Sequence, residues 1–123
     1  MDFDSSVPDL SDTEDQDPQS IRENIDDAIA NSDVVIFMKG NARAPQCGYS
    51  ARAIELIAKH RSLEDVRVEN VLPALDEYRV ALSTHSDWET IPQVYVNGEF
   101  IGGSDILARM DEEGDLAEAL NAI

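Results

Sequence analysis

The chain has 123 residues, a length that suits one domain able to build a core without disulfides or metals. It carries 26 acidic against 9 basic residues, and the net charge of −17 makes nucleic acids and anionic membranes poor partners. The single cysteine, Cys47, excludes an internal disulfide and any metal site built from several cysteines of one chain. No apolar run reaches the roughly 20 residues that span a bilayer and no signal peptide is visible, so we expect a cytoplasmic protein.

Acidic residues are concentrated at the N-terminus. Residues 1–19 hold seven acidic side chains and no base, a composition that cannot bury enough apolar surface to offset the entropy of ordering. We therefore predict a disordered tail over 1–19 and one domain over 20–123. The acidity of the whole chain is explained most simply by a solvated surface. A sharper hypothesis is a halophilic protein, because strong salt screening makes self-repulsion tolerable.

The apolar pattern predicts the elements in chain order. They are a helix over 20–31, a strand over 34–38, a loop over 40–46, a helix over 48–60, a strand over 66–71, a helix over 73–84, two strands over 94–96 and 100–101, and a helical region from 104 to the end, interrupted at Gly114. Ser20 and Glu23 fit a capping box that opens the first helix. The first strand is apolar throughout, which is typical of a central strand covered on both faces.

The remaining strands indicate how the sheet is assembled. Arg67 and Glu69 alternate with valines, which predicts a second strand with one solvated face. Asn97-Gly98 between two apolar runs is a strong signal for a tight β-hairpin. Strands separated by helices favour a parallel pair, and the hairpin adds an antiparallel one. The sequence therefore predicts an α/β fold with a mixed four-stranded sheet flanked by helices.

Cys47 lies between a loop and the start of a predicted helix. The free N–H groups and the positive dipole end of that helix favour thiolate over thiol, and Lys39 adds a positive charge. A thiolate is both a nucleophile and a metal ligand. A free cysteine is also often a small buried apolar residue, so its position alone leaves both interpretations open.

Four short motifs decide between them. In chain order they are Met38-Lys39-Gly40, Cys47-Gly48-Tyr49-Ser50, Trp88-Glu89-Thr90-Ile91-Pro92 and Gly102-Gly103-Ser104-Asp105. Together they resemble a monothiol glutaredoxin of the CGFS type, here Cys-Gly-Tyr-Ser, over about residues 20–120. The resemblance implies a thioredoxin-like fold, which agrees with the element order derived from the apolar pattern.

The resemblance also implies a site residue by residue. Cys47 matches the active cysteine, and the glutathione-binding positions fall on Lys39, Tyr49, Arg79, Ile91, Pro92, Ser104 and Asp105. Lys39 and Arg79 are expected to hold the glycine carboxylate of glutathione. Pro92 is expected to be a cis-proline, with the backbone of Ile91 pairing with the cysteinyl part. Asp105 would meet the γ-glutamyl ammonium, and the N–H groups at the helix start its carboxylate.

Three positions depart from the family pattern, one of them Glu89, which stands where proline is common and places an acid near the thiolate. Tyr49 replaces the usual phenylalanine, and Ser104 replaces a second cysteine often found there. Ser50 stands where dithiol relatives have their second cysteine. Trp88 is expected to pack beneath the loop rather than to touch a ligand.

Two functions from different classes follow. A [2Fe–2S] cluster typically needs four thiolates, and two chains supply two copies of Cys47. The resemblance implies that two glutathione molecules supply the other two, so that one cluster is held in a homodimer. The partners of such a carrier would be apo iron–sulfur proteins and BolA-like proteins. The alternative is a weak glutathione-dependent thiol–disulfide oxidoreductase, whose Cys47 thiolate attacks mixed disulfides without a resolving cysteine. The sequence leaves open whether glutathione or γ-glutamylcysteine is the native thiol.

Overall fold

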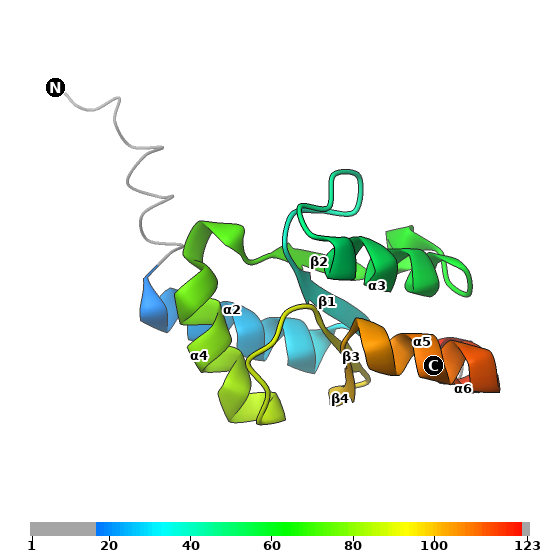
Figure 1. Ribbon diagram of the computed structural model, residues 1–123. Helices are drawn as coiled ribbons and strands as arrows, with labels where there is room; N and C mark the ends of the chain where they lie inside the picture. The colour runs from blue at the N-terminus through cyan, green and yellow to red at the C-terminus, as the bar shows by residue number, and fades with distance from the viewer. Residues whose placement is uncertain (1–16, 122–123) are drawn as a thin grey trace, which may run out of the picture.

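The computed structural model describes residues 17–121, in which helices cover both faces of one sheet (Figure 1). The elements are α2 (Pro18–Asn31), β1 (Val34–Met38), α3 (Gly48–Ala58), the 3₁₀ turn η1 (Leu63–Asp65), β2 (Arg67–Asn70), the 3₁₀ turn η2 (Leu72–Ala74), α4 (Leu75–Ser86), β3 (Gln93–Val96), β4 (Glu99–Gly102), α5 (Ser104–Glu113) and α6 (Asp115–Asn121). Most of the predicted tail, residues 1–16, lies outside the described residues. Within the described range, every helix is too short or too polar to cross a membrane.

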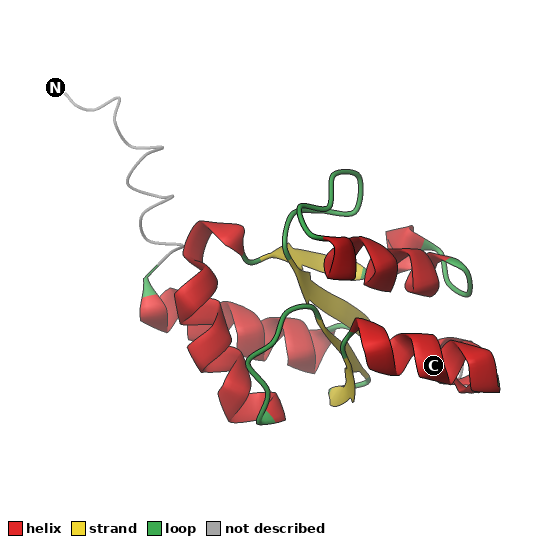
Figure 2. Ribbon diagram, in the orientation of Figure 1, coloured by secondary structure: helices red, strands yellow, loops and turns green. Residues whose placement is uncertain are grey.

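The four strands form a single sheet in the order β2-β1-β3-β4. Strand β1 pairs in parallel with β2 and antiparallel with β3, and β3 pairs antiparallel with β4. Figure 2 shows the strands in yellow between the red helices. The predicted mixed four-stranded sheet is confirmed.

Strand β1 is the centre of the core, because all five of its side chains are buried. Val35 and Phe37 face the layer formed by α2 and α4, whereas Val34, Ile36 and Met38 face α3, α5 and α6. Alternate side chains of a strand point to opposite faces, so an unbroken apolar run is what a strand with two covered faces requires. The predicted central strand is therefore confirmed.

The start of the first helix differs from the prediction. Helix α2 begins at Pro18 with Asp17 as N-cap, so the expected capping box of Ser20 and Glu23 is not formed. Proline fits the first helical position because its φ is already helical and its missing N–H would have had no partner there. Pro18 and Gln19 therefore belong to the helix, and Gln19 Nε2 donates to Glu23 Oε2 at 3.2 Å.

The polar face of β2 is covered rather than solvated, which corrects the second strand prediction. Arg67 donates to Asp27 on α2 at 2.9 Å and to Glu69 at 2.7 Å. Asn24 of α2 accepts from Arg67 at 3.0 Å and donates to Glu69 at 2.9 Å. Because the polar groups satisfy one another, a charged strand face can lie against a helix. The hydrogen bonds from Arg67 and Asn31 also lower the pKa of Asp27.

Other boundaries shift by a few residues. Helix α3 ends at Ala58 rather than residue 60, and Pro73 lies in the 3₁₀ turn η2, which precedes α4 rather than opening it. The hairpin prediction is confirmed: Asn97 and Gly98 both adopt positive φ, of 51° and 85°, as a tight turn between twisted strands requires. The predicted interruption at Gly114 separates α5 from α6.

Candidate thiol site

A closed loop returns the chain from the end of β1 to the start of α3. The N–H of Gln46 donates to the carbonyl of Lys39 at 2.8 Å, and Gly40 forms a β-bridge with Pro45. Inside the loop, the Asn41 side chain accepts from the N–H groups of Arg43 and Ala44. These bonds bring Cys47 next to Lys39 although the two are eight residues apart in sequence. Figure 2 shows this loop in green between β1 and α3.

Cys47 is the N-cap residue of α3 and is partly exposed. Partial burial acts to raise the pKa of its thiol, but the backbone N–H groups of Ser50 and Tyr49, the charge of Lys39 and the Ser50 hydroxyl outweigh it and lower that pKa. The helix start thus favours the thiolate in the manner predicted from the sequence. The site therefore holds a cysteine whose thiolate form is favoured relative to that of an unperturbed thiol.

Ser50 joins the end of β1 to the start of α3 on either side of the Cys47 loop. Its side chain is fully buried, and its Oγ accepts from the backbone N–H of Lys39 at 3.0 Å. Sequence reasoning named Ser50 only as the replacement for a second cysteine. A small hydroxyl one helical turn after the N-cap was the available signal for its role in fixing the end of β1 against α3.

A groove of about 450 Å³ opens at the start of α3, where Tyr49, two residues after Cys47, forms part of its wall. It is lined by Tyr49, Trp88, Thr90, Ile91, Pro92, Gly103, Ser104, Asp105 and Ile106. Five of the predicted glutathione-binding residues are therefore brought together, although they come from segments on α3, before β3 and on α5. Trp88 is 47% exposed and lines this groove, so the expectation that it packs beneath the loop is wrong. Its ring lies against that of Phe100, with centroids 6.5 Å apart.

The wall before β3 contains the expected cis peptide bond between Ile91 and Pro92. Gln93, which is fully buried, supports this wall by donating to the carbonyl of Trp88 at 2.6 Å and to that of Thr90 at 3.3 Å. The Tyr95 hydroxyl donates to Gln93 Oε1 at 2.8 Å. The backbone of the wall is thereby held in place from inside the core.

The wall on α5 approaches the proline segment because glycines precede the helix. Gly102 has a φ of +141°, and a Cβ at this position would lie 2.5 Å from Ile106 Cβ. A Cβ on Gly103 would lie 3.0 Å from the carbonyl oxygen of Pro92. Only glycine allows this conformation and this close approach. The start of α5, with its free N–H groups, consequently faces the groove.

The two predicted cations lie outside the groove lining. Lys39 is at the end of β1, where its charge favours the Cys47 thiolate. Arg79 is on α4, and its guanidinium lies 4.0 Å from the carboxylate of Asp76. Their contacts with the glycine carboxylate of glutathione stay predictions.

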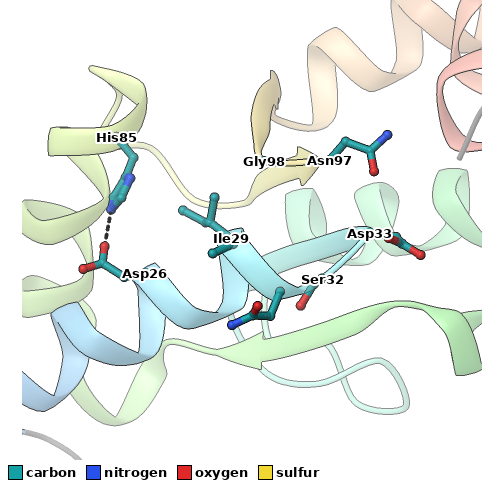
Figure 3. A pocket seen from close by; sticks show the side chains of 9 residues that line it. Asp26, Ile29, Ser32, Asp33, His85, Asn97 and Gly98 are labelled. Carbon is teal, nitrogen blue, oxygen red and sulfur yellow. Dashed lines mark hydrogen bonds and ion pairs between the residues drawn. The ribbon is translucent and has the colours of Figure 1, made fainter.

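A larger cavity, of about 560 Å³, lies elsewhere on the molecule. Figure 3 shows its walls: Asp26 and Ile29 on α2, Ser32 and Asp33 after it, His85 on α4, and the Asn97-Gly98 turn. His85 Nε2 is 2.9 Å from Asp26 Oδ1. None of the predicted site residues is among the residues that line it.

A single cysteine at a helix N-terminus, a cis-proline before β3 and a mixed four-stranded sheet with helices on both faces place the fold in the thioredoxin-like class. The glutaredoxin family profile matches residues 34–101. The chain belongs to the glutaredoxin family.

Relatives support this assignment over most of the chain. Monothiol glutaredoxin-5, mitochondrial, from Schizosaccharomyces pombe is 41% identical over 102 residues, which cover 83% of this chain and 70% of that protein. An uncharacterized monothiol glutaredoxin ycf64-like from Synechocystis is 39% identical, over 78% of this chain and 87% of the relative. The solution structure of a monomeric truncated mutant of Trypanosoma brucei 1-C-Grx1 is 39% identical with a TM-score of 0.69, covering 82% of this chain and 89% of that one. The predicted thioredoxin-like glutaredoxin fold is confirmed.

Proposed function

We propose that this glutaredoxin binds glutathione, or a related γ-glutamyl thiol, in the groove beside Cys47. We propose further that two chains together carry a [2Fe–2S] cluster as cargo for apo iron–sulfur proteins. The observation that supports this most directly is the juxtaposition of one activated thiol with a groove walled by Tyr49, by the Ile91–Pro92 segment and by the start of α5.

The groove has the chemical groups that a γ-glutamyl tripeptide needs. The backbone around Ile91 offers hydrogen-bonding groups to an extended peptide. The N–H groups at the start of α5 attract a carboxylate, and the exposed Asp105 carboxylate attracts an ammonium group. A thiol held at both ends of its peptide would place its sulfur next to Cys47.

The count of thiolates favours a shared cluster. Within residues 17–121, no group of three or more His, Cys, Asp or Glu side chains could hold a metal ion, and the whole chain has one cysteine. A [2Fe–2S] cluster takes four thiolate ligands. Two copies of Cys47 and two bound glutathione thiolates supply that number, so the cargo itself would join the two chains.

The lowered pKa of Cys47 favours a second activity, the removal of glutathione from protein mixed disulfides. The thiolate would attack the glutathione sulfur, form a Cys47–glutathione disulfide and release the protein thiolate. A second glutathione would then reduce this disulfide, leaving oxidised glutathione and free Cys47. We rank this activity second because the chain has no second cysteine to resolve the intermediate.

Partners and compartment belong to the same proposal. We propose a homodimer in the cluster-bound state, with apo iron–sulfur proteins and BolA-like proteins as partners. We propose a cytoplasmic location, and the acidic composition supports a halophilic source. The Schizosaccharomyces pombe relative is named as mitochondrial, so cell fractionation with an antibody to this chain is the direct test.

The proposal is tested by anaerobic reconstitution of the full chain with iron, sulfide and glutathione. We expect a coloured dimer with about two irons and two sulfides per two chains. Cys47→Ser, which nearly keeps the side-chain volume, should bind no cluster and stay monomeric, because a hydroxyl is a poor ligand for this metal centre.

Two controls make the result specific. Reconstitution without glutathione should yield no stable dimer, since half of the ligands are then missing. A full cluster on Cys47→Ser, or one that forms equally without any added thiol, would show that the ligands lie elsewhere. Fast mixed-disulfide turnover with no cluster would favour the oxidoreductase instead.

A further inference from the structure

An ion pair joins the two helices on either side of the groove. Arg52 Nη1 on α3 lies 3.7 Å from Asp105 Oδ1 at the start of α5. Both side chains are accessible, with 54% of Arg52 and 81% of Asp105 exposed. Asp105 lines the groove, and Arg52, which is not part of the lining, places a positive charge beside it.

This arrangement complements one chemical group of a γ-glutamyl thiol. The far end of the γ-glutamyl residue carries an ammonium and a carboxylate on the same carbon atom. Asp105 matches the ammonium, and the free N–H groups at the start of α5 match the carboxylate. Arg52 adds a full positive charge with planar donors at the same place, and guanidinium groups bind carboxylates especially well.

We propose that Arg52 is a specificity-determining residue that binds the α-carboxylate of the γ-glutamyl end while Asp105 binds its ammonium. This inference rests on the proposed binding of a γ-glutamyl thiol in the groove. It names what the site recognises: a thiol with a free α-amino acid zwitterion at one end. Glutathione and γ-glutamylcysteine share this group, whereas thiols without it lose the contact with Arg52.

The pairing of Arg52 with Asp105 also defines an alternative with the opposite effect on ligand affinity, which the test distinguishes. If Arg52 only occupied Asp105, it would compete with the ligand ammonium and its removal would tighten binding. The carboxylate adjacent to that ammonium decides against competition, because the Arg52 guanidinium can contact both carboxylates at once. Both side chains are exposed, so the contribution to binding is modest and falls as salt rises.

The test compares Arg52→Gln with the wild-type chain by calorimetry at low ionic strength. The ligands are S-methylglutathione and its analogue with a 4-aminobutanoyl group in place of γ-glutamyl, which lacks only the α-carboxylate. We expect Arg52→Gln to bind S-methylglutathione about three-fold more weakly and the analogue as well as the wild type does. Arg22→Gln, which removes the same charge from α2 on the other face of the sheet, should change neither affinity.

Several outcomes would overturn the inference. Unchanged or tighter binding of S-methylglutathione to Arg52→Gln would show that Arg52 does not hold the ligand. Equal losses for both ligands would show that the α-carboxylate is not its target, and an equal loss in Arg22→Gln would reduce the effect to net charge. A wild-type chain that binds no S-methylglutathione would instead refute the proposed function itself, and this inference with it.

Discussion

Two of the cavities in the described part of the molecule differ more in the direction of the helices at their walls than in size. The groove beside Cys47 is the smaller, about 450 Å³, and two helices, α3 and α5, begin at its walls. The larger cavity, shown in Figure 3, is about 560 Å³. Helices α2 and α4 end at its walls, and Asp26 and Asp33 line it. Helix N-termini attract anions and stabilise a thiolate, whereas helix C-termini and carboxylates repel both.

The difference teaches that the direction of the helices, rather than the volume of a cavity, selects the place for thiolate chemistry in this fold. In a chain with a net charge of −17, an anionic ligand is repelled by most of the surface. A site for such a ligand therefore needs local positive potential. The groove has it in the starts of α3 and α5, and two cations lie outside its lining, Lys39 near the thiol and Arg52 beside Asp105, while the larger cavity has one histidine next to Asp26.

The largest effect on this contrast is expected from Gly102→Ala, which moves the start of α5. The substitution forces a side chain into a φ of +141° and places its Cβ 2.5 Å from Ile106 Cβ. We expect a loss of about 3 kcal/mol in the free energy of unfolding and weaker binding of glutathione. Denaturant unfolding and calorimetry measure the two effects.

Gly114→Ala is the matched control, because Gly114 has a φ of +84° with nothing within 4 Å of an added Cβ. It should lose only the strain of the left-handed conformation, about 1 kcal/mol, and leave ligand binding unchanged. Equal losses in the two variants would mean that Ile106 moves aside and that the close approach does not shape the groove.

A smaller effect is expected from Lys39→Gln, which removes one positive charge next to the thiol. Because the Lys39 charge favours the thiolate, its removal raises the pKa of Cys47, and the pH profile of alkylation moves to higher pH. At pH 7 the rate of alkylation by iodoacetamide should fall a few-fold. The rates of Lys39→Gln and the wild-type chain should become equal at high pH, where both thiols are ionised.

The only other lysine provides the control for that experiment. Lys59 pairs with Asp111 at the far end of α3, so Lys59→Gln removes the same charge without changing the surroundings of the thiol. An equal shift of the alkylation profile in Lys59→Gln would attribute the effect to net charge rather than to the position of Lys39.

The smallest effect is expected from His85→Gln in the larger cavity. The contact of His85 with Asp26 is largely exposed, so its loss should cost at most about 0.5 kcal/mol of stability. Glutathione binding and cluster assembly should match those of the wild type. A clear loss of either would contradict the functional difference between the two cavities.

Local signals accounted for most of the fold. The unbroken apolar run of β1 predicted a strand covered on both faces, and Asn97-Gly98 predicted the hairpin. Both depend on neighbouring residues alone, which is why they can be recognised in a sequence. The start of the first helix was mispredicted because two local signals compete there. Ser20 matches a capping box, and Pro18 fits the first helical position, where α2 in fact begins. Neighbouring residues alone do not decide between these two signals.

The candidate site was predicted in its residues but not in its contacts. The motifs around Cys47, Pro92 and Asp105 were recognisable by resemblance, and the structure gathers Tyr49, Pro92 and Asp105 around one groove. Trp88 was misplaced because an aromatic side chain in a loop has no periodicity that indicates its burial. Arg52 had no signal at all, because an exposed arginine in a helix looks the same with or without Asp105 beside it.

The sequence by itself determined the elements, the buried central strand, the hairpin and a cysteine at a helix start, because each of these depends on residues close together in the chain. Only the tertiary structure decided that β1 pairs with β3, that the polar face of β2 lies against α2, and that α5 begins next to α3. Those contacts join residues far apart in sequence. They form because the whole set of apolar faces must be buried at once, a condition that no single segment expresses.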